Sequence, residues 1–474
     1  TEEKPGLANV FNIQNLSNSP KTTRLQEGWR EQTQSVFGSA EVGFKGTYYL
    51  TLTARNDWPS QLAGPHSNRK SFFYPSVGLS VVLSEIIPNM PENLEYIKLR
   101  GSYASVGTAF ERYIANPMYQ WNASGLSWNT QTQYPMYDLK PELTNSFEVG
   151  LTVRFLKWFN LDATYYHTNT LNQTFNPQIS TGSGSSEIYI QSGDVLNQGC
   201  EFTLGFNKDW NKFNWSSTYT FSTNMNRIES LAENVLNAAT GEYFSVDLLD
   251  MNGLGLAHFL LMEGGTLGDL YSLADYKYDS NGMIVVNEDG TITPQTITDA
   301  KNYVKLGSVL PKANMSWRND FRIGDFNFGF LITARLGGIV YSSTQAVLDY
   351  YGVSEASAAA RDAGGVFING GDCIDANKWF SSVGGSNPLP QEYTYSGTNV
   401  RLQEASIGYT IPRKKLGDVC DLHLSLVGRN LWMIYNKAPF DPEAVATTGN
   451  YYQGIDHFMM PSLRNFGFNV RVTF

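Results

Sequence analysis

Three side chains that could form a hydrolytic triad lie close together near the end of the sequence. His423 has Asp421 on one side and Ser425 on the other. All three fall on the polar face of a predicted strand, where residues two apart are separated by about 7 Å. The direct hydrogen bonds of a Ser–His–Asp triad require a shorter separation. We therefore interpret His423 as a polar side chain that fills a lumen, and the sequence predicts no enzyme.

A second candidate for chemistry is the acidic stretch "DSNGMIVVNEDG" at 279–290, whose oxygens could hold calcium. It lacks the Glu that an EF-hand loop carries at its twelfth position. A hairpin turn on Asn281–Gly282 explains the same residues without a metal. The three cysteines are widely spaced and make no ligand pair. We expect no metal site and no cofactor, with calcium in this loop as the alternative.

Aromatic residues in the predicted loops are the best candidates for substrate contact, because flat rings stack on sugars and pack against peptide side chains. For each residue, packing within a loop or against a partner protein is the alternative. The candidates are Tyr119, Trp121, Trp128, Tyr350, Tyr351, Trp379, Tyr451 and Tyr452.

The end of the chain, "RNFGFNVRVTF", indicates which kind of element positions these loops. Every second residue is apolar, which predicts a strand with one apolar and one polar face. A lone strand cannot bury its apolar face, so we expect that face to meet lipid. The final aromatic resembles the C-terminal signal by which outer-membrane barrels are recognised for insertion. That candidate assembly signal comprises Phe466, Phe468, Val470, Val472 and Phe474.

The same alternation recurs and predicts about fourteen strands, many of them longer than the 5–6 residues usual in soluble proteins. Membrane-spanning strands need about 9–11 residues. The predicted strands lie near 7–17, 32–44, 46–57, 72–84, 94–107, 143–156, 159–174, 195–207, 213–228, 312–323, 326–340, 399–411, 420–434 and 462–474.

The connections between these strands alternate between short turns and long loops. A transmembrane barrel has this pattern, with short turns facing the periplasm and long loops facing outside. The C-terminus would then be periplasmic. The 229–311 loop is too long to lack structure, so we expect it to fold. The long extracellular loops are predicted near 18–31, 58–71, 108–142, 175–194, 229–311, 341–398 and 435–461.

Composition supports this fold class and excludes others. Charged residues make up 16% of the 474 residues and aromatic residues 14%, whereas soluble domains are about 25% charged. The sequence has no apolar run long enough for a transmembrane helix. The net charge of −10 disfavours nucleic acid as a partner. We predict an all-β protein, a transmembrane antiparallel β-barrel.

Several motifs resemble the C-terminal half of SusC/RagA-type TonB-dependent outer-membrane transporters. "LKPELTNSFEVGL" (139–151) is similar to the family's entry into a strand. "MEGGTLGDLYSLADYKYDSNGMI" (262–284) is similar to a family loop, although Thr266 replaces its usual Pro. The remaining similar segments are "LRGSYASVGTA" (99–109), "NQGCEFTLG" (197–205), "VRLQEASIGYTIP" (400–412), "VGRNLWMIYNKAPFDPE" (427–443) and "MPSLRNFGFNVRVTF" (460–474).

This resemblance implies a barrel of 22 strands with a plug. Residues 1–474 are then expected to form the C-terminal part of the barrel, without the plug. The remaining strands and plug would be a separate chain or a portion cleaved before Thr1. The resemblance also implies a SusD-like surface lipoprotein, the TonB complex and outer-membrane lipid as partners, and a dimer of transporter–lipoprotein pairs. The implied function is TonB-dependent import of oligomeric nutrients across the outer membrane of a Gram-negative bacterium, with glycans the commonest cargo and peptides next.

Two other classes of protein remain as alternatives. A stand-alone outer-membrane barrel with an enzymatic or adhesive role predicts fourteen strands that close on themselves and a cluster of catalytic residues at one rim. A soluble all-β repeat protein predicts short strands and loops of even length. The alternation of loop lengths argues against the second. The sequence does not identify the cargo.

Overall fold

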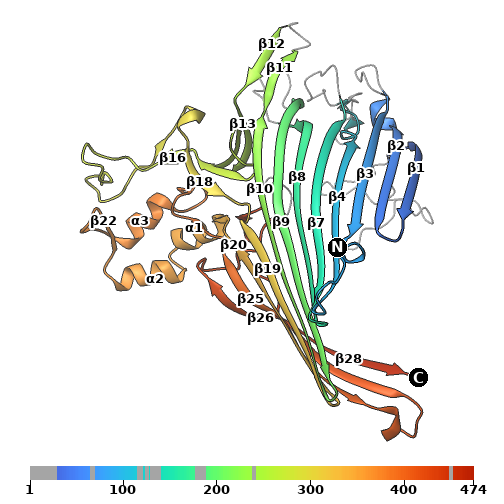
Figure 1. Ribbon diagram of the computed structural model, residues 1–474. Coiled ribbons are helices and arrows are strands. Elements are labelled where there is room, and N and C mark those ends of the chain that lie inside the picture. Colours follow the sequence, from blue (N-terminus) through green and yellow to red (C-terminus); the bar gives the residue numbers. More distant parts are fainter. Residues whose placement is uncertain are drawn as a thin grey trace, which may run out of the picture.

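A computed structural model describes residues 29–63, 70–114, 121–122, 127–128, 140–176, 188–236, 242–447 and 452–474. Its main feature is a curved sheet of thirteen strands whose order follows the chain (Figure 1). All neighbouring strands in this sheet are antiparallel. The strands are β1 (Thr33–Phe44), β2 (Tyr48–Pro59), β3 (Phe72–Val82), β4 (Leu94–Thr108), β7 (Glu142–Phe155), β8 (Phe159–Phe175), β9 (Ile190–Trp210), β10 (Phe213–Ser230), β19 (Ala313–Ile323), β20 (Phe326–Leu336), β25 (Asn399–Ile411), β26 (Asp421–Asn436) and β28 (Asn465–Thr473).

The predicted fold class is confirmed, because these thirteen strands correspond to thirteen of the predicted segments. The remaining predicted strand, 7–17, lies outside the described residues. Within the described residues, β1 and β28 each pair on one side only, so the sheet has two edges.

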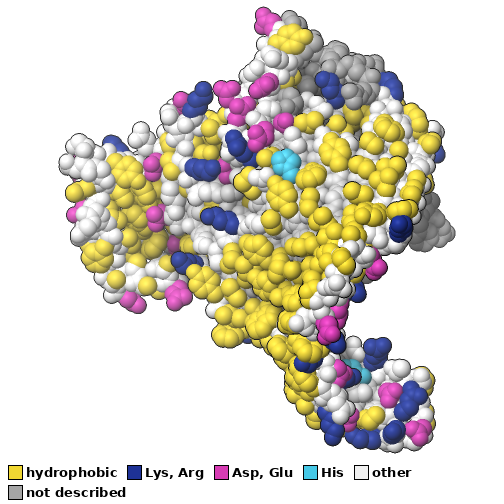
Figure 2. All heavy atoms as spheres, viewed as in Figure 1, with side chains coloured by type: hydrophobic (Ala, Val, Ile, Leu, Met, Phe, Trp, Pro, Cys, Tyr) yellow, Lys and Arg dark blue, Asp and Glu magenta, His cyan; other side chains and the backbone are white. Residues whose placement is uncertain are grey.

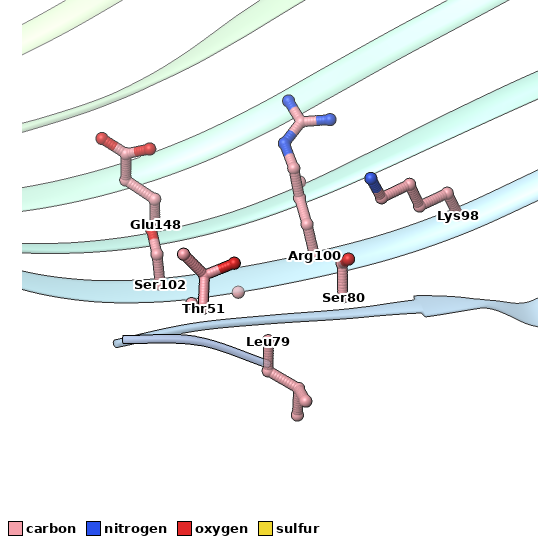
Figure 3. Close-up of a pocket in the computed structure, with 10 residues that line it drawn as sticks. Thr51, Leu79, Ser80, Lys98, Arg100, Ser102 and Glu148 are labelled. Carbon is pink, nitrogen blue, oxygen red and sulfur yellow. The ribbon is translucent and has the colours of Figure 1, made fainter. Parts of the chain in front are cut away.

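The strands alternate as the sequence predicted. Apolar side chains of β28 and its neighbour β26 share one face, which we call the apolar face, and Phe466 is 80% exposed there. Arg100, Glu148 and Ser102 project from the opposite side of the sheet to Leu79 (Figure 3). We call their side the polar face. Hydrophobic side chains cover much of the sheet toward its lower end in Figure 2.

Short and long connections alternate between the two ends of the sheet. The short-turn end carries 45–47, 83–93, 156–158, 211–212, 324–325 and 412–420. The long-loop end carries 60–71, 109–141, 176–189, 231–312, 337–398 and 437–464. In Figure 1 the folded long connections lie above and to the left of the sheet, and the β19–β20 turn lies at its lower end. The C-terminus is at the short-turn end (Figure 1).

Three long connections fold together into a body that we call the cap: the described residues of 231–312, 337–398 and 437–464. Its helices are α1 (Ser343–Tyr350), α2 (Glu355–Asp362) and α3 (Ala376–Val383). Its strands are β11 (Ala232–Leu236), β12 (Tyr243–Val246), β13 (Leu248–Leu254), β14 (Ala257–Met262), β15 (Asp269–Ser272), β16 (Ala274–Asp275), β17 (Gln295–Thr296), β18 (Val304–Ser308), β21 (Ile339–Ser342), β22 (Val366–Ile368), β23 (Asp372–Ile374), β24 (Thr394–Ser396) and β27 (Ile455–Asp456).

Smaller elements complete the described chain. They are β5 (Trp121–Asn122), β6 (Ser127–Trp128) and the 3-10 helices η2 (Ser60–Leu62), η3 (Leu83–Glu85), η5 (Ala300–Asn302) and η6 (Arg413–Lys415). None of the helices in the described part of the chain is long and apolar enough to cross a membrane.

The main hydrophobic core lies in the cap and at the adjoining strand ends, and not along the thirteen-stranded sheet, which we call the wall. Phe259 and Leu261 of β14 are fully buried there, and β14 lies inside the four-stranded sheet β13–β14–β15–β18. Tyr341 comes from the second connection and Ile455 from the third. Each buried side chain of this size contributes about 1.5–3 kcal/mol. The cap therefore folds around its own core, as we expected for the 229–311 loop.

Each cap helix begins after a side chain that caps its first turn. Ser342, Ser354 and Asp375 are the N-cap residues of α1, α2 and α3, and each side chain accepts a backbone N–H of the first turn. Such caps satisfy amide groups that have no partner within the helix. The predicted hairpin turn is also present, with Gly282 at φ +78° and its N–H donating to the Asp279 carbonyl.

Candidate functional site

The polar face carries an arginine that lies flat across the wall. Arg100 of β4 donates to both carboxylate oxygens of Asp162 on β8, at 2.9 and 2.8 Å. Between them lies Gly150 of β7, where a Cβ would be 2.4 Å from Nε of Arg100. Only glycine leaves room for the guanidinium to cross the intervening strand. Thr152 and Thr164 complete the contacts of this side-chain bridge.

A second bridge repeats the same arrangement on the next strands. Tyr166 of β8 donates to Oδ1 of Asn224 on β10 at 3.0 Å. It passes over Gly199 of β9, where a Cβ would be 2.6 Å from the tyrosine oxygen. In both bridges a long polar side chain is held against the wall by a group two strands away. These two side chains therefore lie along the wall instead of projecting from it, and the Arg100 and Asp162 charges are paired.

A shallow cavity of about 210 Å³ opens beside the first bridge (Figure 3). Lys98, Arg100, Ser102 and Glu148 line it and point to the same side in Figure 3. Farther along the sheet, Glu404 lies 3.0 Å from Arg429 and 3.6 Å from Arg318. The wall thus presents hydroxyl groups and charged side chains of both signs.

The histidine near the chain end contacts a neighbouring strand and not the two residues that flank it on its own face. Nδ1 of His423 lies 2.9 Å from Oγ1 of Thr410. Asp421 instead accepts hydrogen bonds from Arg413 in the neighbouring turn. The three residues are on one face but do not form a triad.

A buried ion pair fastens the last cap loop to the sheet. Arg401 of β25 is 3% exposed and lies 2.8 Å from Asp441 and 3.1 Å from Glu443. Burial raises the pKa of the Asp441 carboxyl, but hydrogen bonds, chiefly from Arg401, outweigh it and the net pKa is below its ordinary value. Asn399 donates to Glu443 and accepts from Arg401.

Sequence reasoning did not single out Arg401, although the sequence carries a signal for it. The register between β25 and β26 shifts between Leu402 and Glu404. Val400 and Leu402 then continue the apolar face, and Arg401 is turned to the polar face. The two adjacent polar residues Gln403 and Glu404 break the alternation at this point and mark the bulge.

Thr266, which stands where the sequence resemblance leads us to expect a Pro, has a structural role in the cap. Its Oγ1 donates to Asp269 at 2.7 Å, and its N–H donates to the same carboxylate at 3.1 Å. Lys305 pairs with Asp269 at 2.5 Å. The buried carboxylate is therefore well satisfied, and the turn is closed by a side chain instead of a proline ring.

The structure places the predicted substrate-contact residues in different environments. Tyr350 and Tyr351, at the end of α1, are 43% and 71% exposed and form an edge-to-face pair. Trp379 of α3 is 5% exposed and stacks on Tyr276, so its ring packs in the cap core. Tyr452 is exposed and packs edge-on against Phe259.

The other candidates lie in the 109–141 connection or outside the description. Trp128 of β6 is exposed, and its backbone pairs with that of Trp121 in β5. Tyr119 and Tyr451 lie outside the described residues. Among the candidates whose side chains are described, Tyr350 and Tyr351 are the pair in direct ring contact.

Two acidic turns occur where calcium was considered. Asp279 accepts the N–H groups of Met283 and Asn281, and Asp289 accepts the hydroxyl and the N–H of Thr291. These hydrogen bonds lower the pKa of both carboxyls. Within the described ranges, no group of three or more His, Cys, Asp or Glu side chains is placed to hold a metal ion. The carboxylates therefore have a defined role as turn caps.

Aromatic rings form a continuous belt on the apolar face near the short-turn end. Phe159 stacks with Phe155 at 5.1 Å and contacts Phe206 at 4.9 Å. Phe206 contacts Trp215 at 4.8 Å, and Trp215 stacks on Phe321 at 5.9 Å. Membrane barrels carry such girdles where the apolar band meets the headgroups. We call this set, with Trp158, Trp210 and Phe213, the aromatic belt.

The belt also covers polar side chains on the apolar face. Trp215 donates its indole N–H to Asn319 at 3.0 Å, and Trp317 donates to Ser217 at 3.1 Å. Asn319 is almost fully buried by the neighbouring rings. Indole groups with one polar partner and one apolar surface are typical of the boundary between lipid and water.

Comparisons with known proteins agree with this architecture. The chain is 23% identical to TonB-dependent receptor P3 of Formosa agariphila over 99% of its own length and 48% of that protein. It is 25% identical to TonB-dependent receptor P26 of the same organism, over 99% and 49%. Among solved structures, one described as the RagAB peptide transporter aligns with a TM-score of 0.72 at 18% identity, covering 94% of this chain and 48% of that one.

This chain spans about half the length of the curated relatives it matches. Residues 6–309 match the protein family described as TonB dependent receptor-like, beta-barrel. That match covers more than half of the chain and includes the sheet strands from β1 to β10 together with most of the first cap connection. The chain belongs to the TonB-dependent receptor-like β-barrel family.

Proposed function

We propose that this chain forms the C-terminal part of an outer-membrane barrel that imports oligomeric nutrients with energy from the TonB complex. The observation that carries the proposal is the two-faced sheet, with an aromatic belt on one face, paired polar groups on the other and a folded cap at one end. Membership of the family implies an outer-membrane location. Long loops facing outside and a periplasmic C-terminus are part of the proposal.

The proposed partners follow from surfaces that the described residues leave exposed. Further strands and a plug from the rest of the transporter would complete the sheet at β1 and β28. A SusD-like surface lipoprotein would cover the cap, where Tyr351, Val353 and Phe367 are exposed. Hydrophobic side chains gather over the lobe of β22, α2 and α3 in Figure 2. Pairs of transporter and lipoprotein would associate as dimers.

The proposed cargo is an oligomer, with glycans ahead of peptides. The paired tyrosines of α1 offer flat rings for sugar faces, and the wall offers hydroxyl and paired charged groups instead of a strong field of one sign. Peptides are the second class. The similar RagAB structures are described as a peptide importer, but at 15% identity this likeness concerns the fold.

The first experiment is the intact mass of the natively purified complex, with peptide mapping around Thr1. Co-purifying plug, further strands and a surface lipoprotein support the importer, and the total mass reports the dimer. If the 474-residue chain inserts alone as a closed barrel, the importer proposal fails and a stand-alone barrel replaces it.

Binding to the purified complex then separates the cargo classes. Calorimetry with matched oligosaccharides and oligopeptides should show binding of the former, weakened about tenfold by Tyr351→Ala, the size of one aromatic contact. Tyr243→Ala, which removes an exposed ring from β12, is the control and should leave binding unchanged. Binding of peptides alone would reassign the cargo, and binding of neither would refute import of oligomers.

A further inference from the structure

One lysine lies on the apolar face within the aromatic belt. Lys208 of β9 has its Nζ 3.2 Å from the ring centroid of Trp158 and 4.9 Å from that of Trp210. Strand register assigns it to this face, because Phe206 pairs with Phe159 and the side chains alternate from there. A cation on the lipid side of a wall is costly unless its ammonium reaches the headgroup level.

The surroundings of Lys208 supply a cation–π clamp and no counter-charge. Among the described residues, no carboxylate lies within salt-bridge distance of its ammonium. The adjacent Asp209 is on the opposite face, where it pairs with Arg322 at 3.0 Å. Lys157 and Lys212 are exposed in the two neighbouring short turns and add positive charge at the same end. The site is thus basic, aromatic and bordered by apolar rings.

We propose that this site binds the phosphate of an anionic phospholipid headgroup in the leaflet that meets the short turns. The ammonium would pair with the phosphate, the indoles would hold the ammonium at headgroup level, and the belt from Phe159 to Phe321 would receive the acyl chains. The site requires membrane insertion of the barrel but does not depend on which cargo is imported. Lipid retention and cargo binding are therefore independent readouts.

Native mass spectrometry of the whole receptor tests the site. The purified complex, stripped of lipid in detergent, is titrated with phosphatidylglycerol or with phosphatidylcholine of the same acyl chains. We expect phosphatidylglycerol to be retained preferentially, and Lys208→Gln to reduce its retention about fivefold, the effect of one lysine near a membrane surface. Lys208→Arg should preserve retention because it keeps the charge and the ring contact.

Lys98→Gln is the matched control, because it removes the same charge near the same end but from the polar face. It should leave lipid retention unchanged. Equal retention of the two lipids by the unmodified receptor, or an equal loss in Lys208→Gln and Lys98→Gln, would overturn the proposal. Displacement of phosphatidylglycerol by millimolar inorganic phosphate would also overturn it, since the site would then be a simple anion site. Retention by Lys208→Arg shows that the barrel with an altered residue 208 still folds.

Discussion

Replacing Arg401 by Met should release the last cap loop without unfolding the sheet. Arg401 is 3% exposed, and the change leaves Asp441, which is 12% exposed, as a buried carboxylate without its cation. Removing one partner of a buried pair costs about 3–5 kcal/mol. Glu443 is 38% exposed and adds little, because water screens its charge.

Hydrogen exchange is the appropriate measurement, because the cost falls on a local opening. A loss of about 3–5 kcal/mol corresponds to exchange about a hundred- to several thousandfold faster in residues 441–447 and 452–456, where protection is limited by that opening. Exchange in β19 and β20 should not change. Lys437→Met, which removes an exposed charge from the same loop, is the control.

The pH dependence of loop opening provides a second, independent readout. The pKa of Asp441 is lower in the folded chain than in the unfolded chain. Its pairing therefore stabilises the loop above the unfolded pKa of about 4, and this stabilisation is lost as the pH falls through the folded pKa. Arg401→Met should remove that dependence. Unchanged protection and unchanged pH dependence in the variant would refute the view that the ion pair fastens the loop.

Three further predictions concern the wall and the cap. Gly150→Ala should displace the Arg100 guanidinium and cost about 1–3 kcal/mol in denaturant unfolding, whereas Gly38→Ala, whose Cβ meets nothing within 4 Å, should not disturb any contact. Asp349→Asn should increase protection of α1 from hydrogen exchange at neutral pH. Burial raises the pKa of the Asp349 carboxyl, so the folded helix is more stable at low pH and loses stability as the pH rises. Equal protection of α1 at neutral and acidic pH in the unmodified chain would contradict this. Ser354→Ala should cost α2 about 1 kcal/mol by removing its N-cap, and proteolysis within 355–362 would report it, with Ser381→Ala in α3 as the control.

The sheet was predictable because a period of two is a local signal. Phe466 to Phe474 show it within a few residues, and each membrane-spanning strand repeats it over its own length. The physical cause is that lipid replaces a protein core on one face, so each strand carries its own pattern without reference to distant partners. Segments such as 94–107 and 143–156 therefore match β4 and β7 closely.

The cap was only partly predictable, because its contacts join segments far apart in the chain. The sequence indicated that 229–311 folds, but not that Tyr341 would pair with Ile455 across two connections. Trp379 was selected as a loop aromatic for substrate contact, yet it stacks on Tyr276, which is 103 positions earlier in the sequence. Helices α1 to α3 are eight residues each and depend on their N-caps and packing, a pattern too short to detect by periodicity.

The glycine bridges suggest how wall and cap divide the proposed import function. Gly150 and Gly199 let Arg100 and Tyr166 lie flat, so their polar groups are already satisfied by Asp162 and Asn224. A passing solute would have to break these contacts to gain new ones, which makes the wall a poor place for tight binding and a good one for passage. Discrimination between cargoes should then reside in the cap, where exposed rings have unsatisfied faces. Substitutions at Tyr351 should alter which oligomer binds, whereas Gly150→Ala should alter stability more than choice of cargo.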